Sequence, residues 1–208
     1  MSGHAQLAAS DPVMARLIER FGELSLEHRR GVRVADDLGT LLRGVVGQQV
    51  STGAAAAIWV RFLELFGGAV PSPPELLAVE PGRLREAGLS GRKVEYVRDL
   101  ARHVDDGELE LGRLDELSDE EVIAEISAVR GLGPWTAQIF LIHRLERADV
   151  LPAGDLGIRR AVQAQYGLPE LPSEPAVTRI GAAWRPHRTL ACVYLWHSLR
   201  HDPIEASG

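Results

Sequence analysis

The segment that most constrains the fold is GPWTAQIFLIHRL, residues 133–145, which is apolar on nearly every side when it is drawn as a helix. A helix without a polar face has to be buried, so other parts of the chain must surround it. Pro134 suits the first turn of this helix, and the preceding Gly131-Leu132-Gly133 suits a tight turn after an earlier helix. We therefore expect a core built around two helices joined by a short hairpin.

The rest of the chain also has the spacing of apolar residues that is typical of helices. Several starts are marked by capping residues, such as Ser10 or Asp11 before Pro12, and Ser118 with Glu121 in a capping box. Helices are predicted over residues 10–23, 36–49, 51–67, 72–79, 80–88, 90–104, 118–129, 133–145, 156–167, 173–184 and 186–200. No alternating strand pattern, fixed-length repeat or linker rich in Pro or Ser interrupts them. The sequence thus predicts an all-α fold in one compact unit, with room for two lobes.

Composition excludes several classes of site. The single cysteine, Cys192, excludes an intramolecular disulfide, a cysteine-based zinc site and a cysteine-ligated iron–sulfur cluster. No apolar run approaches the length of a membrane span, and the N-terminus lacks the pattern of a secretion signal. We therefore expect a cytoplasmic protein with no membrane partner.

The charge distribution leaves room for a nucleic-acid partner in spite of a net charge of −6. Residues 126–200 carry nine arginines against five acids, so this part of the chain can present a positive face to phosphates. Only one basic residue, Lys93, is a lysine. The preference for arginine fits either a compositional bias or bidentate phosphate contacts.

The hairpin around Gly131 and Gly133 is the first candidate for chemistry. Glycines let another backbone approach closely, and the helix that begins at Pro134 presents amide groups that suit a phosphate. The alternative is an ordinary turn between two helices.

The second candidate is Asp155 in VLPAGDLGIRR, residues 150–160. Its position directly before an amphipathic helix predicts an N-cap, and the helix dipole favours a negative charge there. Such a carboxylate can stabilise a developing cation or activate water, or it can serve only as a cap. Arg159 and Arg160 follow one turn later and can bind phosphate or point into solvent.

Taken in order, the segments RGVVGQQVS, SGRKVEYVRDLA, VRGLGPWTAQIFLI, LPAGDLGIRRAV and WRPHRTLACVYLW resemble DNA-3-methyladenine glycosylase II (AlkA-type), in the helix-hairpin-helix/GPD DNA glycosylase superfamily. The resemblance covers roughly residues 35–200. It implies a single catalytic domain over 1–208 with two helical lobes, an active-site cleft between them, and no N-terminal β lobe. Lobe one is expected near 34–128, lobe two near 1–33 plus 129–208, and the helix-hairpin-helix at 119–147.

The resemblance also implies roles for particular residues. Asp155 corresponds to the catalytic aspartate that faces C1′ of a nucleotide flipped out of the duplex, and Trp135 and Trp196 correspond to aromatic walls of the base pocket. The DNA-binding positions are the hairpin amides of Gly131, Gly133 and Thr136, together with Gln48, Gln49 as the wedge, and Arg159. The backbone carbonyls of Ser127, Val129 and Gly131 correspond to those that hold a sodium or potassium ion.

The implied activity is excision of alkylated bases, of the 3-methyladenine and 7-methylguanine type, from double-stranded DNA in base excision repair. Trp135 stands where superfamily members that also cut the backbone carry a nucleophilic lysine, so we expect no lyase activity. No cofactor and no iron–sulfur cluster are expected, and the protein is expected to be a monomer associated with the nucleoid. Two alternatives stay open: a non-catalytic helix-hairpin-helix DNA-binding module, and a helical interaction protein with no DNA role.

Overall fold

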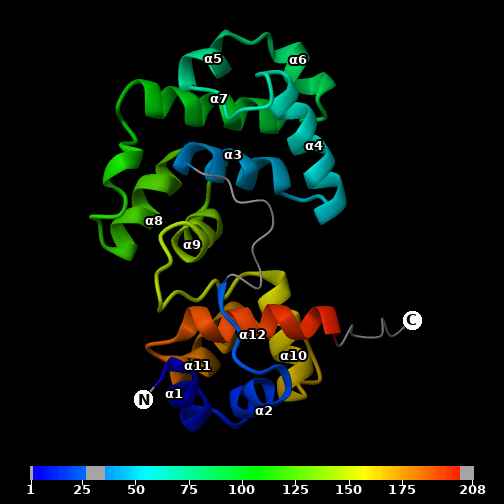
Figure 1. Ribbon diagram of the computed structural model, residues 1–208, viewed down its shortest axis with the longest axis vertical. Coiled ribbons are helices and arrows are strands. Elements are labelled where there is room, and N and C mark those ends of the chain that lie inside the picture. The colour runs from blue at the N-terminus through cyan, green and yellow to red at the C-terminus, as the bar shows by residue number, and fades with distance from the viewer. Residues whose placement is uncertain (1, 27–35, 202–208) are drawn as a thin grey trace. The chain divides into compact units, whose positions relative to one another are not determined.

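A computed structural model describes residues 2–26 and 36–201, and in this part of the chain every regular element is a helix (Figure 1). The elements are α1 (Gly3–Ser10), α2 (Pro12–Phe21), α3 (Asp37–Gly47), α4 (Thr52–Glu64), α5 (Pro73–Ala78), α6 (Pro81–Glu86), α7 (Gly91–Asp105), the 3-10 helix η2 (Leu111–Arg113), α8 (Asp119–Ala128), α9 (Pro134–His143), α10 (Leu156–Tyr166), α11 (Glu174–Ile180), the 3-10 helix η3 (Gly181–Trp184) and α12 (Arg188–His201). The predicted all-α class is confirmed. Within the described part of the chain, no helix combines the length and the apolar character that crossing a membrane requires.

Local sequence explains where most of these helices begin. Ser118 Oγ accepts a hydrogen bond from the Glu121 amide, and the Glu121 carboxylate accepts one from the Ser118 amide, which is the predicted capping box. Asp11 caps α2 by accepting from the amides of Val13 and Met14 at 2.7 and 3.1 Å. Helix α1 was not predicted, because it buries only Leu7 and so lacks an apolar stripe.

The chain divides into two compact units. Unit 1 comprises residues 1–33 and 141–208, and unit 2 comprises residues 34–140. The division falls inside α9, whereas the sequence placed the boundary between lobes after residue 128. The first part of α9 belongs to unit 2 because Thr136 lies against Gly44 of α3, where an added Cβ would be 3.4 Å from the Thr136 methyl carbon.

In unit 2, α7 lies between α3 and the short helices α5 and α6 (Figure 1). Helix α3 supplies much of the core because its apolar spacing buries several residues of one face, namely Leu38, Leu41, Leu42, Val45 and Val46. The apolar residues of the hairpin region join this core, namely Ile126, Val129, Leu132, Ala137 and Phe140.

In unit 1, α12 packs against α10, α2 and α1 and is buried along most of its length. Asp11, the N-cap of α2, connects this helix to α10 and η3, because its second carboxylate oxygen accepts hydrogen bonds from the Tyr166 hydroxyl at 2.7 Å and the Trp184 indole at 3.1 Å. Burial and the neighbouring Asp11 carboxylate raise the pKa of Tyr166, so its hydroxyl stays a proton donor to Asp11.

Candidate functional site

Asp155 is the N-cap of α10, as the sequence predicted. Its Oδ1 accepts a hydrogen bond from the Ile158 amide at 2.9 Å, and its own amide donates to the Pro152 carbonyl at 2.9 Å. The same Oδ1 accepts a second hydrogen bond from the indole Nε1 of Trp196 at 2.8 Å. A half-buried carboxylate is thus held in one orientation by a helix start and by a side chain from α12.

Trp196 is only 5% exposed, and its ring stacks on His143 with 6.0 Å between centroids and 26° between planes. The structure gives the indole a definite task, because its N–H binds the Asp155 carboxylate. Its predicted role as a wall of the base pocket stays a prediction.

Gly157 is a site residue that the sequence reasoning missed. A Cβ at this position would lie 2.9 Å from Asp155 Oδ1 and 3.2 Å from Trp196 Cδ1. Any larger residue would therefore push the carboxylate and the indole apart. The Asp-Leu-Gly order at the helix start is a usable signal, since glycine has a low intrinsic helix propensity and a glycine inside a helical pattern often has a packing reason.

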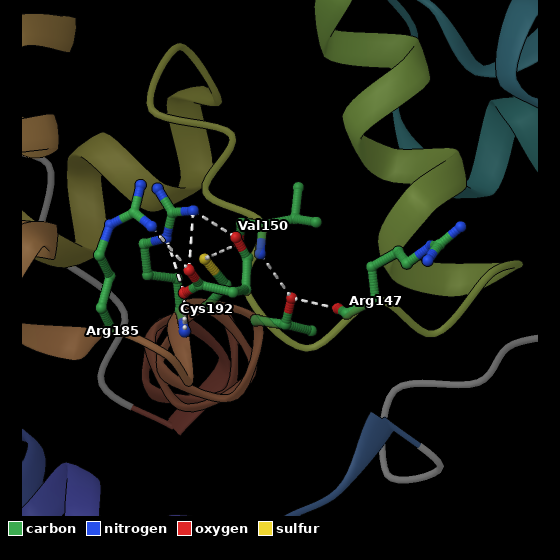
Figure 2. A network of polar contacts seen from close by, with 7 residues as sticks. Arg147, Val150, Arg185 and Cys192 are labelled. Atoms are coloured by element: carbon green, nitrogen blue, oxygen red, sulfur yellow. Dashed lines mark hydrogen bonds and ion pairs between the residues drawn. The ribbon is translucent and has the colours of Figure 1, made fainter. Parts of the chain in front are cut away.

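The loop before Asp155 is fixed to the start of α12 by a network of polar contacts (Figure 2). The Asp149 carboxylate accepts from Arg188 Nε at 2.8 Å and forms an ion pair with Arg185 at 3.1 Å. The Thr189 hydroxyl donates to the Arg147 carbonyl at 2.6 Å and accepts from the Val150 amide at 3.1 Å. These bonds restrict the movement of residues 147–150. The position of Asp155 is therefore fixed by the chain before it and by α10 after it.

Arg159 was predicted to bind DNA. In the structure its Nε donates to the Pro172 carbonyl at 2.7 Å, which ties α10 to the segment that precedes α11. Part of the guanidinium therefore has a structural contact, and its contact with DNA stays a prediction. Arg160 is exposed.

The hairpin lies in unit 2. Gly131 has a φ of 86°, Leu132 is buried, and no atom lies within 4 Å of a Cβ added at Gly133. The open space at Gly133 leaves room for a foreign backbone, and the phosphate contact predicted there stays a prediction. The Thr136 amide donates to the Gly133 carbonyl at 2.9 Å and so takes part in the first turn of α9. Its predicted phosphate contact stays a prediction.

Side chains of α7 contact the hairpin, and the sequence did not predict these contacts. A Cβ at Gly131 would lie only 2.2–2.5 Å from ring atoms of Tyr96, so the ring packs directly on this glycine. The Arg130 amide donates to Asp99 Oδ2 at 3.0 Å, and the Arg130 guanidinium pairs with Glu95 at 3.1 Å.

The turn between α3 and α4 is joined to the same hairpin. Gln48 Nε2 donates to the Gly131 carbonyl at 2.9 Å, so the structure brings these two predicted residues together. Gln49 is exposed and has a φ of 56°, an uncommon conformation for a residue with a side chain. Lys93 supports the turn, because its buried Nζ donates to the Val46 carbonyl at 2.7 Å and burial lowers the pKa of its amine.

Of the predicted cation ligands, two carbonyls already accept hydrogen bonds. The Val129 carbonyl accepts from the Leu132 amide at 3.1 Å, and the Gly131 carbonyl accepts from Gln48. A carbonyl oxygen has two lone pairs, so either can take a further partner. The Ser127 hydroxyl oxygen is buried without a hydrogen-bond partner. In the described residues no cluster of His, Cys, Asp or Glu could hold a metal ion.

The candidate residues fall in both units. Asp155, Arg159 and Trp196 belong to unit 1, whereas the hairpin, the two glutamines and Trp135 belong to unit 2. Trp135 is the second residue of α9 and is 40% exposed, so part of its side chain lies at the surface of that unit.

Comparisons with known proteins agree with this geometry. Residues 42–186 match the model of the HhH-GPD superfamily base excision DNA repair protein. DNA-3-methyladenine glycosylase 1 of Schizosaccharomyces pombe is 31% identical over 192 residues, covering 91% of this chain and 83% of that protein. The putative DNA-3-methyladenine glycosylase YfjP of Bacillus subtilis is 27% identical over 199 residues, covering 89% of this chain and 69% of that protein.

Solved structures give the same result. The S. pombe 3-methyladenine DNA glycosylase in complex with abasic DNA superposes with a TM-score of 0.86 and 29% identity, covering 96% of this chain and 97% of that one. The DNA-3-methyladenine glycosidase of Bacillus halodurans superposes with a TM-score of 0.81 and 35% identity, covering 95% of this chain and 89% of that one.

Proposed function

The chain belongs to the HhH-GPD superfamily of base excision DNA repair proteins, and from this premise we propose that it is a monofunctional DNA glycosylase acting on alkylated bases. The substrate is double-stranded DNA that carries bases of the 3-methyladenine or 7-methylguanine type. The protein acts as a monomer in the cytoplasm, at the nucleoid. The observation that carries the proposal is the Asp155 carboxylate, which a helix start and the Trp196 indole hold in one orientation.

The chemistry follows from the charge of the substrate. Alkylation at N3 or N7 makes the purine cationic, so it leaves readily once it has been flipped out of the duplex. Breaking the N-glycosidic bond develops positive charge at C1′, and a carboxylate fixed in advance stabilises that charge without reorganising. Asp155 has this role, or it aligns the attacking water, and Trp196 and Ile158 keep its Oδ1 in place.

Unit 2 supplies the proposed contacts with the DNA backbone. The amides of Gly131, Gly133 and Thr136 bind one phosphate, and the backbone carbonyls of Ser127, Val129 and Gly131 would hold a sodium or potassium ion, whose positive charge would attract that phosphate. The open approach at Gly133 supports this assignment. Gln49 fills the gap left by the flipped base, a role for which its exposed position and φ of 56° suit it.

The base pocket uses aromatic side chains. A cationic purine is attracted to the face of an indole, and we assign this contact to Trp135 and Trp196. The assignment to Trp135 is supported by its exposed fraction of 40%.

Hydrolysis without backbone cleavage follows from the position of the only lysine. Lys93 is 9% exposed and its amine donates to the Val46 carbonyl, so it cannot serve as a nucleophile at an open site. Without a Schiff base the product is an intact strand with an abasic site.

The proposal is tested with a duplex that carries one 7-methylguanine or 3-methyladenine. The expected result is release of the free base, with strand cleavage only after alkali treatment. Binding without release would favour the non-catalytic DNA-binding module, and cleavage without alkali would contradict the assignment as a hydrolase.

A further inference from the structure

We infer that unit 2 contains a second phosphate-binding site, an arginine-lined pocket that holds a backbone phosphate of the DNA beside the hairpin. The pocket has a volume of about 430 Å³ and lies between α6, α7 and the residue that precedes the hairpin. Its charged lining residues are Arg85, Glu95, Arg98, Asp99, Arg102 and Arg130. The inference rests on the proposed function, because it takes DNA as the ligand.

The pocket is positive although it lies in the most acidic part of the chain. Residues 75–125 carry fifteen acids against seven bases, yet the pocket gathers four arginines and only two acids. Folding therefore concentrates positive charge at one place on unit 2, which residue counts along the chain cannot show.

The two acids are already engaged by protein donors. Asp99 accepts from the Arg130 amide at 3.0 Å and from Arg102 Nη1 at 2.9 Å, and Glu95 pairs with Arg130 Nη2 at 3.1 Å. Their charges are thus partly compensated before any ligand arrives. An anion in the pocket therefore meets an excess of positive charge.

The arginines keep donors for a ligand. A guanidinium has five N–H groups, and Arg102 and Arg98 each use one terminal nitrogen, on Asp99 and on the Val79 carbonyl. Among the residues that the structure describes, the Arg85 side chain has no hydrogen-bond or ion-pair partner. A planar guanidinium can donate hydrogen bonds to two phosphate oxygens at once. A lining of arginines therefore suits a phosphate better than a surface of point charges would.

The pocket adjoins the hairpin through Arg130. The backbone of Arg130 leads directly into Gly131, while its side chain lines the pocket. Tyr96 and Asp99 of α7 fix this stretch of chain, so the hairpin and the pocket share a wall. We therefore take the DNA strand that contacts the hairpin as the source of the phosphate in the pocket.

The test compares two arginines of α6 that differ in whether they line the pocket. Arg85 lines it, whereas Arg83 is exposed outside it and gives a control with the same change of charge. Binding of Arg85→Ala and Arg83→Ala to a duplex with an abasic site is measured by fluorescence anisotropy over a series of salt concentrations. Thermal unfolding of both variants checks that they fold.

Loss of one phosphate contact makes the negative slope of the logarithm of the association constant against the logarithm of the salt concentration shallower by about one. When the salt concentration rises from about 50 to 200 mM, the affinity of the wild type for the duplex should therefore fall by a factor about three times larger than the factor for Arg85→Ala. Arg83→Ala should keep the wild-type slope. An unchanged slope in Arg85→Ala, or an equal decrease in Arg83→Ala, would overturn the inference.

A second measurement identifies the source of the phosphate. Inorganic phosphate is titrated against the wild type and Arg85→Ala, with the thermal unfolding midpoint as the readout. Stabilisation of the wild type alone, with no change in the DNA slope, would assign the pocket to free phosphate and overturn the DNA assignment. Both measurements report binding, so a wild-type protein that binds DNA without releasing a base refutes the proposed function separately.

Discussion

Replacing Gly131 with alanine is the sharpest test of the hairpin geometry. Gly131 has a φ of 86°, which disfavours any residue with a side chain. The new Cβ would also lie 2.2 Å from Tyr96 Cγ and 2.3–2.5 Å from two further ring atoms, far inside van der Waals contact. The substitution therefore strains the backbone and forces the Tyr96 ring to move.

The expected cost has two parts. A Cβ in a left-handed conformation costs about 1–2 kcal/mol. Inserting a methyl group into a packed site costs about 1–3 kcal/mol more. The sum, about 2–5 kcal/mol, is a large fraction of the roughly 5–15 kcal/mol that stabilises a typical domain. Gly131→Ala should therefore lower the free energy of unfolding by about this sum.

Urea unfolding followed by circular dichroism measures this cost, and Gly133→Ala is the matched control. Gly133 has no atom within 4 Å of an added Cβ, so its replacement should change the free energy of unfolding by less than about 1 kcal/mol. The same replacement should weaken binding to an abasic-site duplex, because the methyl group occupies the open approach. In a Tyr96→Ala background, the cost of Gly131→Ala should fall to the backbone part alone.

Two results would refute the reasoning. A Gly131→Ala protein that unfolds at the wild-type urea concentration would show that the backbone does not have the left-handed conformation. A cost that is the same with and without Tyr96 would show that the ring does not pack on Gly131.

Three further predictions concern side chains that support the site. Trp196→Phe keeps an aromatic ring but loses the N–H on Asp155, so base release in single turnover should slow about tenfold or more while DNA binding changes little; an unchanged rate would contradict the role of the indole. Gln48→Leu removes the bond to the Gly131 carbonyl, so the dissociation constant for an abasic-site duplex should rise several-fold while release at saturating enzyme persists. Burial lowers the pKa of Lys93 from its ordinary value of 10.5, so the unfolded chain binds more protons at this residue as the pH approaches 10.5; the free energy of unfolding of the wild type, measured with urea relative to Lys93→Met, should therefore increase over this pH range, and a constant difference would contradict the effect of burial.

The helices could be predicted because their signals are local. Caps and apolar spacing mark α2, α8 and α10, and the cap position of Asp155 follows from the amphipathic segment after it. Helix α1 escaped prediction because its sequence carries no apolar stripe, and its burial comes from packing against α2 and α12.

The contacts that complete the site could not be predicted, because they join residues far apart in the sequence. Trp196 and Asp155 are separated by 41 positions, and Gln48 and Gly131 by 83. Which donor meets which acceptor depends on how the helices pack, and neither residue of a pair carries that information alone. The motifs indicated the candidate residues, and the fold assigned the bonds between them.

The most direct test of the central claim is the single-turnover rate of base release by wild type and Asp155→Asn. The measurement uses excess enzyme and a duplex with one 7-methylguanine, with the exposed Glu170→Gln as a charge-matched control. Asparagine keeps an oxygen for the Ile158 and Trp196 donors, so binding to an abasic-site duplex should stay within about threefold of the wild-type value.

Asp155→Asn should release base at least about a hundredfold more slowly than the wild type, because the fixed negative charge is gone, while Glu170→Gln should keep the wild-type rate. Release by Asp155→Asn at the wild-type rate would contradict a role of the Asp155 charge in the cleavage of the N-glycosidic bond.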